Sequence, residues 1–176
     1  NDVLALRGDT QKGARRFIPD KDGHSHANEL VEQIANMNNG KYLEDTLEVT
    51  TPSNFCIGVA GYPEKHFEAP NRRIDIENLK KKVDAGAHYI VTQMFFDNSK
   101  FFQFRDDCVK AGITIPIIAG VKPISALNDI NLLPQAFHID LPNDLYVAAQ
   151  KCTTDKEVRE VGIEWTTMQS KELIKE

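Results

Sequence analysis

Four short apolar runs alternate with longer segments in which apolar residues recur every three or four positions. The runs are residues 3–6 (VLAL), 55–59 (FCIGV), 88–94 (HYIVTQM) and 115–120 (IPIIAG). None has the strict apolar-polar alternation of a strand with one solvated face, so we expect each to be a strand covered on both faces. Buried strands of this kind are typical of a parallel sheet.

Helices are predicted between these strands and after the last one. They cover residues 29–38, 75–85 and 99–111 and a segment that begins at Thr154, where Thr154 and Glu157 form a capping box. Asn28 is the candidate N-cap of the first helix. The residues expected on the inner faces of the last two helices are Phe101, Phe102, Arg105, Cys108 and Val109, then Val158, Val161, Trp165 and Met168. Strands alternating with helices predict right-handed βαβ units.

The spacing of the units leaves two architectures open within the α/β class. Four βα units of roughly 27 to 50 residues extrapolate to a (β/α)8 TIM barrel of roughly 250 to 300 residues. The 176 residues then form the middle and later part of a barrel. The alternative is a small open sheet with four strands. In both, residues 1–176 are one domain, and a ligand meets the carboxyl ends of the strands.

Composition narrows the class of protein without identifying it. The chain is 41% hydrophobic and 27% charged, close to the average of soluble globular proteins. No apolar run approaches the roughly 18 residues of a membrane span, and a net charge of −5 gives no basis for binding nucleic acid. The three cysteines match neither a metal cluster nor a disulfide framework, so we expect a cytoplasmic protein.

Polar residues follow each predicted strand, at the edge where a ligand is expected. They are Arg7-Gly8-Asp9, then Tyr62 to His66, then Gln93, then Lys122. Any one of them can be a loop or capping residue, but their coincidence at four successive strand ends indicates a site. Asp9 can accept hydrogen bonds from a ligand ring, Gly8 lets a flat ligand approach the backbone, and Gln93 offers both a donor and an acceptor.

The predicted helix at residues 75–85 carries a polar stripe. Asp75, Asn78 and Lys82 fall within about 60° of one another on a helical wheel. A carboxylate suits hydroxyl groups and a lysine suits phosphate, so the stripe fits a ligand that combines a polyol with phosphate. The alternative is a solvated face on which Asp75 is the N-cap.

Other chemistries find less support. The sequence holds no P-loop, no GxGxxG, no GxSxG and no paired histidines at the spacing of a helical metal site. Lys122, near a strand end, leaves open a Schiff-base aldolase.

Several strings of residues resemble the methylenetetrahydrofolate reductase family, in the family's order and over essentially the whole chain. They are Leu6-Arg7-Gly8-Asp9, Ala60-Gly61-Tyr62-Pro63-Glu64-Lys65-His66, residues 78–87 (NLKKKVDAGA) and residues 92–97 (TQMFFD). The resemblance implies an oxidoreductase on a (β/α)8 barrel, of which this chain supplies roughly strands 4–7 with their helices. It implies non-covalent FAD, with NADH or NADPH as donor, and reduction of methylenetetrahydrofolate to methyltetrahydrofolate in one-carbon metabolism and methionine biosynthesis.

The resemblance also assigns roles to residues. Asp9 and Gln93 match catalytic positions that also contact the folate, and Asp129 stands where the family often has a substrate-binding glutamine. The positions that match FAD contacts are Arg7, Gly8, Asp9, His26, Ala27, Tyr62, His66, Asp75, Asn78, Lys81 and Lys82. The family's catalytic glutamate has no counterpart in this chain, so we expect the chain alone to be inactive. The alternative function is a non-catalytic half-barrel with partial flavin affinity, in which free strand edges favour homo-oligomers.

Overall fold

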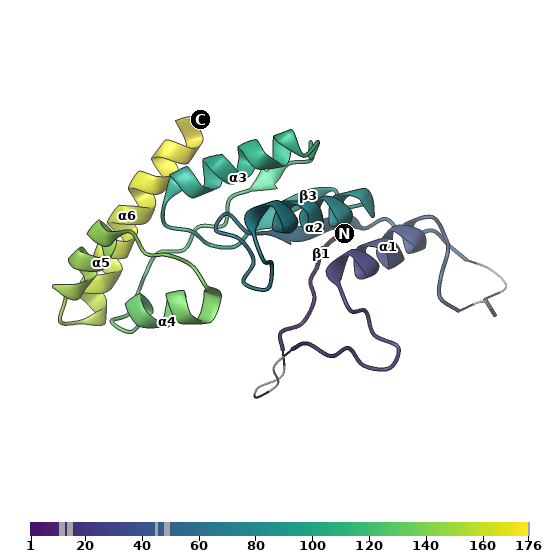
Figure 1. Ribbon diagram of the computed structural model, residues 1–176, viewed down its shortest axis with the longest axis horizontal. Helices are drawn as coiled ribbons and strands as arrows, with labels where there is room; N and C mark the ends of the chain where they lie inside the picture. The colour runs from purple at the N-terminus through teal and green to yellow at the C-terminus, as the bar shows by residue number, and fades with distance from the viewer. Residues whose placement is uncertain (11–12, 14–15, 45, 48–49, 176) are drawn as a thin grey trace.

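The computed structural model describes residues 1–10, 13, 16–44, 46–47 and 50–175. Helices and strands alternate through most of this length, and three helices in succession end it (Figure 1). In chain order the elements are β1 (Asp2–Ala5), α1 (Ala27–Asn38), β2 (Cys56–Gly61), α2 (Arg72–Asp84), β3 (Tyr89–Thr92), α3 (Asn98–Lys110), β4 (Ile117–Ile118), α4 (Asp129–Phe137), α5 (Asn143–Gln150) and α6 (Asp155–Lys175).

The four strands form one parallel sheet in the order β1-β2-β3-β4. Ala5 lies opposite Val59, Gly61 opposite Thr92, and Ile90 opposite Ile117. Each strand overlaps a predicted apolar run, and a helix separates each strand from the next. The predicted α/β class with a parallel sheet is therefore confirmed. Within the described ranges the sheet is open, with β1 and β4 at its edges.

The first core lies between one face of the sheet and helices α1, α2 and α3. It contains Ile57, Val59 and Ile90 from the strands, together with Val31, Ile76, Leu79, Phe104 and Cys108 from the helices. Successive side chains of a strand point to opposite faces, and the other face carries Leu4, Leu6 and Ile118, which are exposed. That face is therefore less covered, and the expectation that every strand is covered on both faces was wrong.

The second core lies among the last three helices, at the left of Figure 1, where α5 and α6 lie side by side. Its buried members are Phe96, Ile124, Leu133, Ile139, Leu145, Ala149 and Val158. Trp165 Nε1 donates to the carbonyl of Phe96 at 3.0 Å, which ties α6 to the segment after β3. A Cβ at Gly162 would lie 2.0 Å from the carbonyl oxygen of Ile124, so only glycine allows α6 this approach.

The helix boundaries differ from prediction mainly at the N-termini. α1 begins with His26 as its N-cap, which places the predicted cap, Asn28, inside the helix. The N-cap of α2 is Asn71, whose Oδ1 accepts from the Ile74 N–H at 3.0 Å, so Asp75 is not the cap. The capping box of α6 is confirmed, since Glu157 Oε2 accepts from the Thr154 N–H at 3.0 Å.

Two predicted core positions were wrong. Val109 is 66% exposed and Met168 is 54% exposed, whereas Phe104, one turn before Cys108, is buried. Both errors arise because periodicity gives the spacing of an apolar stripe more reliably than its width.

None of the helices in the described ranges combines the length and the apolar composition that a membrane span needs.

Candidate functional site

A cleft of about 810 Å³ lies at the carboxyl ends of β1, β2 and β3. Of the predicted site residues, those that line it are Arg7, Asp9, His26, Ala27, Tyr62, His66, Asp75, Asn78, Lys81, Lys82 and Gln93. They come from the segments after three strands, from the start of α1 and from one face of α2. The predicted convergence of Asp9, Tyr62 and Gln93 on a common mouth is therefore observed.

Two predicted site residues do not line the cleft. Gly8 is absent from the lining, and the nearest heavy atom to a Cβ placed there is Phe17 Cε2 at 4.0 Å. Asp129 is buried at the start of α4, where its Oδ2 accepts from the N–H groups of Ser125 at 2.7 Å and Ala126 at 3.1 Å. One oxygen of the Asp129 carboxylate is thus held by the turn that precedes α4.

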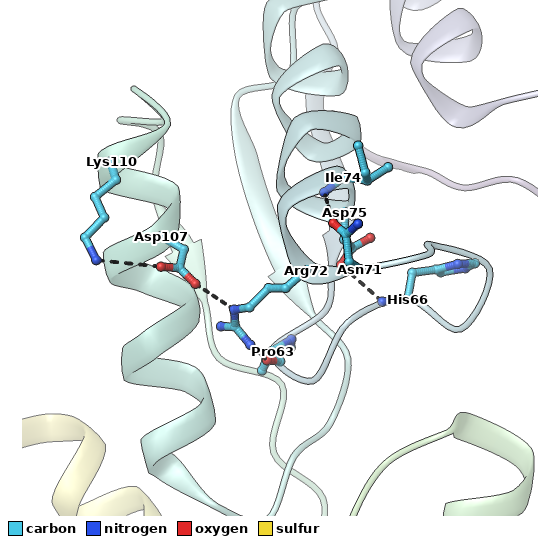
Figure 2. Close-up of polar contacts among 8 residues, drawn as sticks. All are labelled: Pro63, His66, Asn71, Arg72, Ile74, Asp75, Asp107 and Lys110. Carbon is cyan, nitrogen blue, oxygen red and sulfur yellow. Dashed lines mark hydrogen bonds and ion pairs between the residues drawn. The ribbon is translucent and has the colours of Figure 1, made fainter.

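The segment after β2 forms one wall of the cleft and is held at several points. Lys65 has a φ of 86°, a left-handed conformation that is rare for a residue with a side chain. Its Nζ donates to the carbonyls of His66 at 2.9 Å and Ala69 at 2.7 Å. The His66 N–H donates to Asp75 Oδ2 at 3.1 Å, as Figure 2 shows. These contacts keep Tyr62 and His66 at the cleft although the backbone between them is strained.

The polar stripe of α2 faces the cleft, as the helical wheel predicts. Lys82 Nζ donates to the carbonyl of Ala60 at 2.5 Å and lies 5.9 Å from the centre of the Tyr62 ring. Burial lowers the pKa of Lys82 to about 8, and the negative charge of Asp75 opposes this shift. Burial raises the pKa of Asp75, although its hydrogen bond from the His66 N–H lowers it. The stripe therefore presents a half-buried ammonium beside a buried carboxyl group.

A ladder of four rings continues from Tyr62 toward the end of α4. The ring centres of Tyr62 and His66 are 4.6 Å apart, those of His66 and Phe67 4.8 Å, and those of Phe67 and His138 4.6 Å. Burial lowers the pKa of His66 and raises that of Tyr62. Both rings are therefore uncharged near neutral pH, which suits a flat, partly apolar ligand.

The strand ends supply the remaining polar groups. Arg7 Nη2 donates to Glu68 Oε2 at 2.7 Å, which joins the segment after β1 to that after β2. Gln93 donates its backbone N–H to the carbonyl of Gly61 at 2.8 Å, and its Oε1 accepts from the Met94 N–H at 3.0 Å. Lys122 does not line the cleft, so the imine chemistry considered for it gains no support from this site.

Some residues of the cleft were not singled out from the sequence. Phe67 and Glu68 follow directly on the predicted stretch from Tyr62 to His66, so their proximity in sequence was a usable signal. His138 had no such signal, because it reaches the cleft only through the turn that ends α4, where its φ is 54°.

Comparison with known proteins identifies relatives over nearly the whole chain. The sequence profile of the family described as methylenetetrahydrofolate reductase matches residues 1–176. Methylenetetrahydrofolate reductase 2 of Saccharomyces cerevisiae is 36% identical over 163 residues, which are 91% of this chain and 25% of that protein. The 5,10-methylenetetrahydrofolate reductase of Salmonella typhimurium is 35% identical over 162 residues, 90% of this chain and 47% of that protein. The chain thus spans less than half the length of these relatives.

A solved structure is similar to part of the chain. It is an uncharacterized protein from Clostridium thermocellum, described as binding two copies of 5-methyl-5,6,7,8-tetrahydrofolic acid. Its TM-score is 0.48 at 15% identity, covering 69% of this chain and 43% of that one. This likeness is too distant to bear on the ligand of the cleft.

Proposed function

This chain belongs to the methylenetetrahydrofolate reductase family, and we propose that its cleft binds FAD as part of an enzyme that reduces methylenetetrahydrofolate to methyltetrahydrofolate. A nicotinamide cofactor, NADH or NADPH, is the proposed electron donor. The observation that carries the proposal is the cleft at the strand ends. There, groups suited to a dinucleotide and groups suited to a folate ring line one space.

The residues of the cleft fit FAD by their chemistry. The pyrophosphate of FAD is anionic, and the ammonium of Lys82, whose pKa is lowered only to about 8, is still mostly charged near neutral pH. The ribityl and ribose groups carry hydroxyls, for which Asp75 and Asn78 on the same helix face provide oxygen acceptors. The uncharged rings of Tyr62 and His66 suit the flat isoalloxazine system. No part of this assignment needs a metal ion.

The protein residues supply binding, orientation and electrostatics. When bound, FAD supplies the redox chemistry by accepting hydride from the donor and passing it to the folate. Asp9, in the segment after β1, accepts hydrogen bonds from the substrate ring. Gln93 offers its side-chain amide, which binds an amide edge without adding charge. Asp129 is left out of the proposed folate contacts because it does not line the cleft and its Oδ2 accepts from the Ser125 and Ala126 N–H groups.

We also propose that the four strands are part of a (β/α)8 barrel, in one domain. Two observations support this. In the part of the chain that the structure describes, the sheet has free edges at β1 and β4, and its less covered face carries the exposed side chains of Leu4, Leu6 and Ile118. Further strands that pair with both edges would enclose that face, as the interior of a barrel does.

The proposal is tested on the full-length protein with two matched variants of α2. Lys82→Met removes the charge at the cleft, and Lys80→Met removes a lysine that pairs with Asp84 outside it. We expect Lys82→Met to weaken FAD binding about tenfold or more, because a charged hydrogen-bond partner is lost, and Lys80→Met to leave it unchanged. Flavin fluorescence during titration measures the affinity.

Two further outcomes separate the proposal from its alternative. Oxidation of NADH or NADPH with menadione or methylenetetrahydrofolate as acceptor reports hydride transfer. A full-length protein that binds no FAD refutes the proposal outright. A protein that binds FAD but transfers no hydride to either acceptor supports the non-catalytic half-barrel instead.

A further inference from the structure

Arg72, the first residue of α2, joins three parts of the chain behind the cleft. Its Nε donates to Asp107 Oδ2 on α3 at 2.6 Å, and its Nη1 donates to the carbonyl of Pro63 at 2.9 Å (Figure 2). Asp107 is also 3.8 Å from Lys110 Nζ, one turn later in α3. None of these residues lines the cleft.

The position of Arg72 is unfavourable for an isolated helix. A cation in the first turn opposes the helix dipole, so an arginine there needs compensation from elsewhere. The adjacent Arg73 pairs with Glu77 on the exposed side of the same helix. Arg72 is instead half-buried between α2 and α3, and Asp107 provides its counter-charge. The two neighbouring arginines therefore differ in their surroundings, which makes one a control for the other.

The carbonyl that Arg72 binds controls the course of the cleft wall. Pro63 is fully buried, and its ring fixes its own φ and restricts the backbone of Tyr62. With its carbonyl held, the peptide that leads to Glu64 is fixed in orientation. Asp75, one turn after Arg72, holds the N–H of His66. Arg72 and Asp75 on α2 thus hold Pro63 and His66 of the wall, and each pair is three residues apart in sequence.

We propose that Arg72 is a positioning residue of the cleft. Held by Asp107, it fixes the Pro63 carbonyl and so keeps Tyr62 and His66 in the geometry that receives the ligand, which it does not touch itself. The inference rests on the proposed function in one respect only, namely that the ligand is FAD. The geometry of the wall is a separate claim and is measured separately.

The test compares four variants of the full-length protein. Arg72→Gln removes the charge, and Asp107→Asn leaves Arg72 in place without its counter-charge. Arg73→Gln is the control at the neighbouring arginine, and Asn71→Ala is the control that weakens the same helix through its cap. We expect Arg72→Gln and Asp107→Asn to weaken FAD binding about tenfold, because each loses a hydrogen bond to a charged group. They should also change the visible circular dichroism of the bound flavin. The last two should change neither, since they leave the contact to Pro63 intact.

Hydrogen exchange of backbone amides measures how firmly the cleft wall is held, without any ligand. The Lys65 N–H donates to the carbonyl of Tyr62 at 3.1 Å, and the His66 N–H donates to Asp75. Exchange at these two amides should become faster in Arg72→Gln and Asp107→Asn, while exchange at Gly86, at the far end of α2, should not. Arg72→Lys should recover part of both effects, because an ammonium keeps the charge but not the paired geometry.

The outcomes separate the positioning role of Arg72 from the proposed binding of FAD. Equal exchange at Lys65 and His66 in Arg72→Gln and Arg73→Gln overturns the positioning role, whatever the affinity for FAD. A wild-type protein that binds no FAD refutes the proposed function, and the exchange measurement still decides the role of Arg72. If Arg72→Gln does not fold, Asp107→Asn and Arg72→Lys carry the same comparison.

Discussion

Glu64 is a half-buried carboxyl group whose surroundings predict a specific dependence of stability on pH. It follows Pro63 in the cleft wall but does not line the cleft. Its Oε2 accepts from the Asp140 N–H at 2.6 Å, whereas its Oε1 is buried without a partner in the described part of the chain. Burial raises the pKa of Glu64 to about 7 from the 4.5 of an exposed glutamate, and the hydrogen bond from Asp140 only partly opposes this. The charged groups nearby are Asp140, Lys100 and Asp97.

The sign of the effect follows from proton linkage. Because the folded protein holds the Glu64 proton more tightly than the unfolded chain, raising the pH from about 4.5 to about 7 lowers the stability of the fold. A shift of this size corresponds to about 3 kcal/mol for a fully buried group. Since Glu64 is only half-buried, solvent screening reduces this to about 1–2 kcal/mol.

Glu64→Gln tests the prediction, since glutamine keeps an oxygen for the Asp140 N–H and cannot ionise. We expect the variant to be about 1–2 kcal/mol more stable than wild type at pH 8 and nearly equal to it at about pH 4, below the pKa of the unfolded chain. Urea unfolding followed by far-ultraviolet circular dichroism measures both values. Glu160→Gln, at an exposed position of α6, is the control and should show no such difference. A stability gap for Glu64→Gln that is the same at both pH values, or that favours wild type at pH 8, refutes the reasoning.

Three further predictions concern the cleft and its supports. The affinity for FAD should fall as the pH rises through about 8, where Lys82 loses its charge. FAD titrations between pH 7 and pH 9 should show this fall in the wild type and not in Lys82→Met. Asn71→Ala should lower the free energy of unfolding by about 1 kcal/mol, measured by urea unfolding, because the Ile74 N–H loses its cap. Gly162→Ala should lower it by about 3 kcal/mol in the same assay, because its methyl group would collide with the backbone at Ile124. Equal unfolding midpoints for Gly162→Ala and wild type would contradict the close approach of α6.

The strands and the polar stripe of α2 could be predicted because their signals are local. Each strand is a compact apolar run, and Asp75, Asn78 and Lys82 share a face by the period of the helix alone. The convergence of Asp9, Tyr62 and Gln93 also followed from the sequence, since parallel strands put their carboxyl ends at one edge.

Other features could not be predicted because they depend on contacts distant in sequence. α4 and α5 were not expected, since both are short and α4 contains Pro134, which interrupts helical hydrogen bonding. The position of Asp129 relative to the cleft was not visible either. The hydrogen bonds to its Oδ2 depend on the turn at Ser125 rather than on any motif.

The wall after β2 illustrates why a site can be recognised from sequence while its geometry cannot. Lys65 adopts a left-handed conformation that costs of order 1–3 kcal/mol for a residue with a side chain, so contacts elsewhere must offset it. Those contacts come from α2 through Arg72 and Asp75, and from the connection between α4 and α5 through the Asp140 N–H. Since they come from separate parts of the chain, the wall has its shape only when the two cores are both formed. Loss of any one contact should therefore loosen Tyr62 and His66 at the cleft before it unfolds the sheet on which they stand.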